Sequence, residues 1–148
     1  MNYSKVTFSD KAKKVGKDLG FKDPAVVQGM YIFKQPKIGA KVTPHQDGTF
    51  LNNDPLKLVG FWFPIDDATL ENGCLWYIPG SHKLPIKRRF IRNPDISENQ
   101  SLMIFEGDEY ETKDEDWIPA PVKKGTETFL NLLRLLRQKR LLRLMRLN

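Results

Sequence analysis

The sequence predicts a mainly β fold with peripheral helices. Two apolar runs, at 58–65 and 74–78, are rich in aromatic and branched residues and are bounded by Asn, Asp, Gly or Pro, as buried strands are. One short segment near the N-terminus instead carries its apolar residues at helical spacing. The 148 residues are 40% hydrophobic and 28% charged, so the chain can bury the core of a single domain.

The expected helix follows Ser9, whose hydroxyl can cap its first turn. Ala12, Val15 and Leu19 then fall on one face of the helix. Gly20 comes directly after the last apolar position and is a natural stop.

Strands are expected at 26–33, at 42–47 and at the two apolar runs, with a turn at 36–39. On composition alone, Trp62, Phe63, Trp76 and Tyr77 are expected to be core residues. The single cysteine, Cys74, is either a redox-sensitive thiol or a small buried strand residue, and its apolar neighbours favour the second. Between 83 and 117 no period is evident, so we expect loops there.

The most informative residues are His45 and Asp47. Because strand side chains alternate, the two are predicted to project from one face while Gln46 points away. A histidine and a carboxylate are two of the three ligands of the 2-His-1-carboxylate site that holds non-haem Fe(II). The pattern is common by chance, and the sequence contains only one other histidine, His82.

Several motifs in order make the assignment more specific. They are Gln28–Pro36, Pro44–Asp47, Asp67–Trp76 and Ile78–His82. From about Val6 to Arg89 the chain resembles the phytanoyl-CoA dioxygenase (PhyH) family of Fe(II)- and 2-oxoglutarate-dependent oxygenases, and the likeness continues more loosely through Gly125-Thr126.

The resemblance implies a partial double-stranded β-helix core of the jelly-roll or cupin-like kind. It implies that His45 and Asp47 bind Fe(II), and that Met30 and Trp62 line the pocket for 2-oxoglutarate. The implied enzyme is a dioxygenase that uses Fe(II), 2-oxoglutarate and O₂ to hydroxylate a small molecule. That substrate would be an acyl-CoA or another lipid-related acid.

The chain also departs from the family pattern. The family carries a distal histidine on a strand just after a Gly-Thr-like pair, and then an arginine that holds 2-oxoglutarate. Here no histidine follows Gly125-Thr126 and no period-two pattern is evident, so no strand is expected. The region that precedes Val6 in the family is expected to be missing too. We therefore expect a partial oxygenase domain at 1–126, inactive or impaired, and a basic Leu/Arg-rich tail without family match at 127–148.

Two alternatives stay open for the function. The chain could be a noncatalytic metal-binding fragment, or an interaction module that acts through its tail. His82 could complete a metal triad with His45 and Asp47, but in the family this turn does not carry an iron ligand. A structural role at the pocket rim is therefore the favoured interpretation of His82.

The net charge of +6 belongs to the tail. Residues 129–148 contain six basic and no acidic residues, whereas residues 1–128 contain 18 of each. The neutral body gives no reason to expect nucleic acid as its partner. Arginine recurs every third residue from 134 to 146, which does not form one helical face. The tail could bind phosphates or a membrane surface, but an altered reading frame or splice variant is favoured.

Two charge clusters lie in the expected loops. The basic cluster consists of Lys87, Arg88, Arg89 and Arg92; it could hold an anionic substrate such as a CoA thioester, or it could simply be a loop rim. The acidic residues at 106–116 could bind a cation, but they lack calcium-loop spacing and are expected to be solvated. With one cysteine, no span-length apolar run and no leader, a cytoplasmic location is expected.

Overall fold

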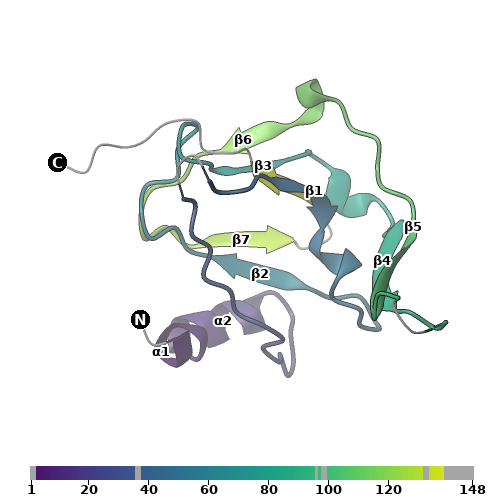
Figure 1. The fold of residues 1–148 in the computed structure, drawn as a ribbon. Helices are drawn as coiled ribbons and strands as arrows, with labels where there is room; N and C mark the ends of the chain where they lie inside the picture. The colour runs from purple at the N-terminus through teal and green to yellow at the C-terminus, as the bar shows by residue number, and fades with distance from the viewer. Residues whose placement is uncertain (1–2, 36–37, 96, 98–99, 132–133, 139–148) are drawn as a thin grey trace. The chain divides into compact units, whose positions relative to one another are not determined.

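The computed structural model describes residues 3–35, 38–95, 97, 100–131 and 134–138. The chain forms two compact units, Met1–Phe33 and Lys34–Asn148, and the second contains all the strands (Figure 1). The mainly β prediction is confirmed. Within the described residues, no helix is both long and apolar enough to cross a membrane.

The first unit contains two helices, α1 (Tyr3–Thr7) and α2 (Asp10–Asp18). The predicted cap of α2 is confirmed, because the Ser9 hydroxyl accepts a hydrogen bond of 3.2 Å from the Ala12 N–H. Gly20 follows the helix with a φ of 84°, a left-handed conformation that glycine adopts without strain.

The strand predicted at 26–33 is wrong. The segment is irregular, and none of the described strands pairs with it. Val27, Met30 and Phe33 are 67%, 66% and 69% exposed. A β-rich composition becomes a strand only when a neighbouring ladder satisfies its backbone groups, and the structure supplies no such ladder here.

The main sheet of the second unit is antiparallel, with the strand order β1-β8-β3-β6 (Figure 1). It consists of β1 (Val42–Gln46), β8 (Leu135–Gln138), β3 (Leu75–Tyr77) and β6 (Ile118–Ala120). The core of the described residues includes the buried side chains of Cys74, Leu75, Trp117, Leu135 and Leu136. The two apolar runs predicted as strands, 58–65 and 74–78, each contain a strand. These strands, Val59–Trp62 and β3, are shorter than the runs.

The expectation that no strand follows Gly125-Thr126 is wrong. β7 (Thr128–Asn131) pairs with β2 (Val59–Trp62), and β8 occupies an interior position between β1 and β3. Leucines at 135 and 136 are 4% and 5% exposed. The segment contributes to the core although its sequence lacks a period-two pattern.

An arginine in an interior strand needs compensating contacts, and Arg137 has them. Its guanidinium lies 4.4 Å from the centre of the Trp117 ring and 5.5 Å from that of Trp76. Its Nη1 also donates to Asp114 at 2.6 Å. Ring faces and a carboxylate together replace part of the hydration that the cation loses. The remainder of the arginine repeat, from residue 139 onward, lies outside the described residues.

A hairpin occupies part of the segment in which loops were expected. It consists of β4 (Arg88–Arg92) and β5 (Met103–Gly107), and Phe90 pairs with Phe105 across it. The ring centres of these two residues are 4.8 Å apart. Three of the five residues of β4 are arginines, which hid the strand in the sequence, so the loop expectation for 83–117 is corrected here.

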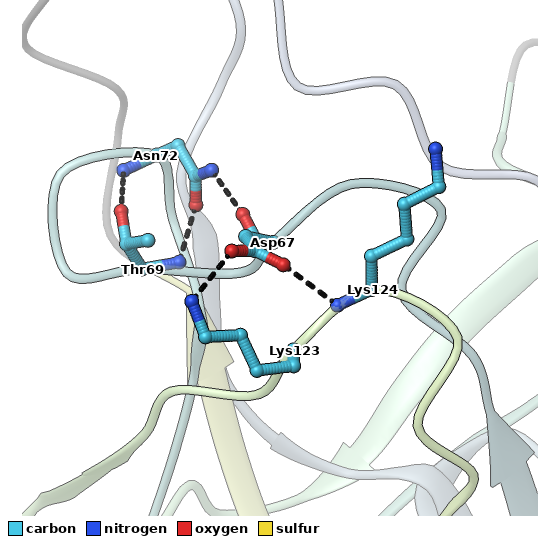
Figure 2. A network of polar contacts seen from close by, with 5 residues as sticks. All are labelled: Asp67, Thr69, Asn72, Lys123 and Lys124. Carbon is cyan, nitrogen blue, oxygen red and sulfur yellow. Dashed lines mark hydrogen bonds and ion pairs between the residues drawn. The ribbon is translucent and has the colours of Figure 1, made fainter.

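The Asp67–Cys74 loop forms a closed polar network (Figure 2). Asn72 accepts from the Thr69 N–H at 2.6 Å and donates to the backbone carbonyl of Asp67. The Asp67 carboxylate accepts from the Lys123 ammonium at 2.8 Å and from the Lys124 N–H at 2.9 Å. These donors lower the pKa of Asp67. Asn72 therefore closes the loop, and Asp67 fastens it to Lys123 and Lys124.

Candidate metal centre

His45 and Asp47 come together at the end of β1. The Nε2 of His45 lies 3.2 Å from the Oδ1 of Asp47, and the two side chains are 23% and 26% exposed. The strand argument needs one correction, because β1 ends at Gln46 and Asp47 opens a 3₁₀ turn, η1 (Asp47–Thr49). The turn, and not strand alternation alone, brings the carboxylate to the imidazole.

A backbone carbonyl fixes the orientation of the His45 ring. Nδ1 lies 2.8 Å from the carbonyl oxygen of Thr43, so we assign the donating hydrogen to Nδ1. Nε2 is then the ring atom that faces Asp47. Metal-bound histidines ordinarily donate their second ring nitrogen in this way, which fixes the tautomer that can bind an ion.

The surroundings of His45 raise its pKa above the ordinary 6.5. Burial alone lowers the pKa, but the hydrogen bonds to Asp47 and Thr43 and the charge of Asp47 outweigh that effect. The imidazolium form, which pairs with the Asp47 carboxylate, is therefore favoured over a wider pH range than in an ordinary histidine. An ion that binds Nε2 must displace this proton.

A small cleft of about 70 Å³ lies beside His45. Its walls include Phe50, Arg88, Phe105, Tyr110 and Leu135. Phe50 contacts the imidazole edge-on, with ring centres 5.9 Å apart. The volume admits an ion with a few waters, and it is well below the roughly 300 Å³ at which small-molecule pockets begin.

Three members of the basic cluster make contacts within the protein. Arg88 pairs with Glu109 and lies over the Phe105 ring. Lys87 lies 4.7 Å from the centre of the Tyr110 ring. Arg89 donates to the carbonyl of Gly48 at 2.8 Å. Of these contacts, the Arg89 hydrogen bond joins the hairpin to the turn that follows β1.

No group of three or more metal-binding side chains occurs in the part of the chain that the structure describes. His82, in the 3₁₀ turn η2 (Ser81–Lys83), accordingly does not join His45 and Asp47. The same turn supports β8, because the Ser81 hydroxyl accepts from the Leu135 N–H at 3.0 Å. The acidic segment at 106–116 likewise supplies no such group.

The two residues predicted to hold 2-oxoglutarate lie in different units. Met30 is in the first unit and is 66% exposed. Trp62 ends β2 in the second unit and is half-buried; it is not among the residues that line the cleft beside His45. Both assignments stay predictions.

Sequence reasoning missed Thr43 and Arg89. The Thr43 contact uses a backbone carbonyl, which any residue provides, so no residue type could have indicated it. Arg89 was visible only as one of four clustered cations. Recognising the β4–β5 hairpin from its cross-strand pairs would have placed Arg89 on a strand.

The model of the family described as phytanoyl-CoA dioxygenase (PhyH) matches residues 3–132. Phytanoyl-CoA dioxygenase domain-containing protein 1 of Danio rerio is 48% identical over 124 residues, which cover 83% of this chain and 42% of that protein. A phytanoyl-CoA dioxygenase of Arabidopsis thaliana is 46% identical, with 84% and 42% covered. The chain thus spans less than half the length of these relatives.

Two crystal structures of EvdO2 from Micromonospora carbonacea var. aurantiaca resemble this chain in fold. The TM-scores are 0.53 and, for the complex with 2-oxoglutarate, 0.51. In both cases the identity is 24%, with 74% of this chain and 42% of EvdO2 covered. The fold supports what the sequence matches show on their own: the chain belongs to the phytanoyl-CoA dioxygenase family.

Proposed function

We propose that the chain carries part of the metal centre of an Fe(II)- and 2-oxoglutarate-dependent dioxygenase, with His45 and Asp47 as two protein ligands. The observation that carries this is the convergence of Nε2 and Oδ1, 3.2 Å apart at the end of one strand. The donor set is that of two-thirds of the facial triad, and family membership supports the same chemistry.

The residues of this chain would hold the ion as follows. The Thr43 carbonyl keeps Nδ1 protonated, so that Nε2 presents its lone pair once its own proton has left. The Asp47 carboxylate supplies the negative charge that offsets the cation. When bound, Fe(II) with 2-oxoglutarate and O₂ would supply the oxidation of a C–H bond, coupled to conversion of 2-oxoglutarate to succinate. Phe50 and Phe105 form part of the wall of the cleft beside His45.

We further propose that this 148-residue chain is inactive or impaired as an oxygenase. The sequence holds two histidines, and the second, His82, lies in the turn that anchors β8. β8 lies directly beside β1, but its residue opposite His45 is Leu136, whose side chain cannot bind a metal ion. One protein ligand is therefore lacking at the position where an adjacent strand could provide it.

The finer fold and partner assignments belong to this proposal. The strand order β1-β8-β3-β6, with the separate β2–β7 pair, supports a partial jelly-roll core. Met30 and Trp62 would contact 2-oxoglutarate, and the substrate would be a small molecule such as an acyl-CoA or another lipid-related acid. The single cysteine supports a reducing, cytoplasmic setting.

Calorimetry with Mn(II) as a stand-in for Fe(II) tests the assignment. The chain is expected to bind Mn(II) weakly, and His45→Ala or Asp47→Ala should each abolish binding, since one remaining ligand forms no chelate. His82→Ala is the matched control and should bind like the wild type. Equal affinity in all four proteins would refute the site. Succinate formation that depends on His45 would refute the proposed inactivity.

A further inference from the structure

We propose that Arg89 is a positioning residue for the metal centre: by holding the carbonyl of Gly48, it fixes the turn that presents Asp47. The inference rests on the proposed function of His45 and Asp47 as metal ligands. Arg89 is one of four basic residues in its cluster, and its charge alone does not distinguish it from the other three.

The contact joins segments far apart in the chain. Nη1 of Arg89, on β4, donates to the carbonyl oxygen of Gly48 at 2.8 Å, across 41 positions of sequence. Gly48 and Thr49 are buried. A buried carbonyl without a donor is costly, so this hydrogen bond restrains the residue directly after Asp47.

The same hairpin holds the far end of the turn by packing. The Phe50 ring lies 5.8 Å from Phe90 and 5.9 Å from Phe105, measured between ring centres. Phe50 also contacts His45 edge-on. Within the turn, the N–H groups of Phe50 and Leu51 donate to the Asp47 carbonyl at 3.0 and 3.1 Å. The Arg89 hydrogen bond is the polar contact that ties this turn to β4.

The neighbouring arginines have different tasks. Arg88 pairs with Glu109 and lies over the Phe105 ring, whereas Arg92 ends the strand and is exposed. Arg92 is thus a matched control for Arg89, because it has the same charge on the same strand. Groups that support a ligand from behind commonly change metal affinity by about 10–100-fold when removed.

The experiment measures Co(II) affinity, visible absorption and the free energy of unfolding for Arg89→Met, Arg89→Lys and Arg92→Met in the full chain. Methionine keeps an unbranched apolar stem but cannot donate, whereas lysine can still donate. We expect Arg89→Met to weaken Co(II) binding at least about tenfold and to change the Co(II) absorption bands. Arg89→Lys should recover part of both, and Arg92→Met should match the wild type.

The outcomes separate the two proposals. Suppose that Arg89→Met and Arg92→Met have equal Co(II) affinity and spectra, while His45→Ala does not bind Co(II). That result would overturn the role of Arg89 and leave the metal site standing. Co(II) binding that survives His45→Ala would overturn both. If Arg89→Met does not fold, the folded Arg89→Lys variant decides. A Co(II) affinity below that of Arg92→Met, with changed absorption bands, supports the role of Arg89, whereas an affinity and spectrum equal to those of Arg92→Met overturn it.

Discussion

Leu136 lies directly opposite His45 in the antiparallel pairing of β8 with β1. Residues paired in this way project from the same face of a sheet, with Cβ atoms about 4.5–5.5 Å apart. The side chain next to the proposed ligand pair is thus a buried leucine, 5% exposed.

This register predicts a gain of function for Leu136→His. The new imidazole would lie beside Nε2 of His45 and Oδ1 of Asp47, and we expect Co(II) affinity to rise about tenfold or more, which corresponds to roughly 1.4 kcal/mol. Titration followed by visible absorption measures it. Leu75→His is the control, because Leu75 is also buried but lies on β3, where it pairs with Ala120 and Gln138 and not with β1. Equal gains in both variants would contradict the register.

The affinity of the site for metal should depend on pH. The pKa of His45 is raised, so the metal must compete with a proton until the pH exceeds that raised value. We expect Mn(II) affinity to increase as pH rises through the pKa of His45, above 6.5. Calorimetry at several pH values, with the proton release compared in two buffers, provides the measurement. An affinity that does not change between pH 6 and 8 would contradict the role of His45.

The stability of the metal-free chain should change in the opposite direction. A histidine whose pKa is higher in the folded state stabilises the fold below its unfolded pKa, and this contribution is lost as pH rises through the folded pKa. Urea unfolding should therefore show a decrease in stability over the range where metal affinity increases. The His45→Gln variant should lack that decrease.

Ser81 is predicted to stabilise the placement of β8. Its hydroxyl donates to the Ile78 carbonyl at 2.7 Å and accepts from the Leu135 N–H at 3.0 Å, in a site that is 2% exposed. Ser81→Ala leaves that buried N–H without its partner and should cost about 1–3 kcal/mol of unfolding free energy. Ser101→Ala removes an exposed hydroxyl and serves as the control. Equal losses in the two variants would show that the Ser81 contact contributes nothing special.

Truncation can test whether β8 belongs to the fold. A chain that ends at Asn131 lacks β8 and exposes Leu75 of β3 and the inner edge of β1, so it should lose cooperative unfolding. A chain that ends at Gln138 keeps every described strand and should unfold cooperatively. Circular dichroism during thermal unfolding distinguishes them. Similar transitions in both would mean that residues 132–138 are not part of the core.

The sequence predicted those helices and strands whose local residue pattern favours the same structure as their tertiary contacts do. Ser9 and Gly20 mark α2 because caps act within one turn, and the apolar run around Leu75 indicates a strand wherever it is placed. The segment at 26–33 has the same composition, yet it has no ladder partner and remains irregular. In the other direction, β8 has arginine at 137 in an interior strand, which the distant Asp114, Trp117 and Trp76 make tolerable.

The sequence predicted the two proposed metal ligands, but it did not predict the residues that hold those ligands in place. His45 and Asp47 are recognisable because their side chains carry metal chemistry at a short spacing. Their support comes from the Thr43 backbone and from Arg89, which lies on a hairpin that formed where loops were expected. Long-range contacts of this kind depend on strand pairing, and pairing is not encoded in the neighbouring residues.

The interior position of β8 has a consequence for synthesis on the ribosome. β1 and β3 leave the exit tunnel well before residues 135–138, and each then has an unpaired edge on the side that β8 will fill. The sheet cannot be completed until this late strand has emerged, so the nascent chain exposes strand edges that can pair with other chains. Folding of the second unit therefore waits for β8, and chaperones that cover open strand edges should influence its yield.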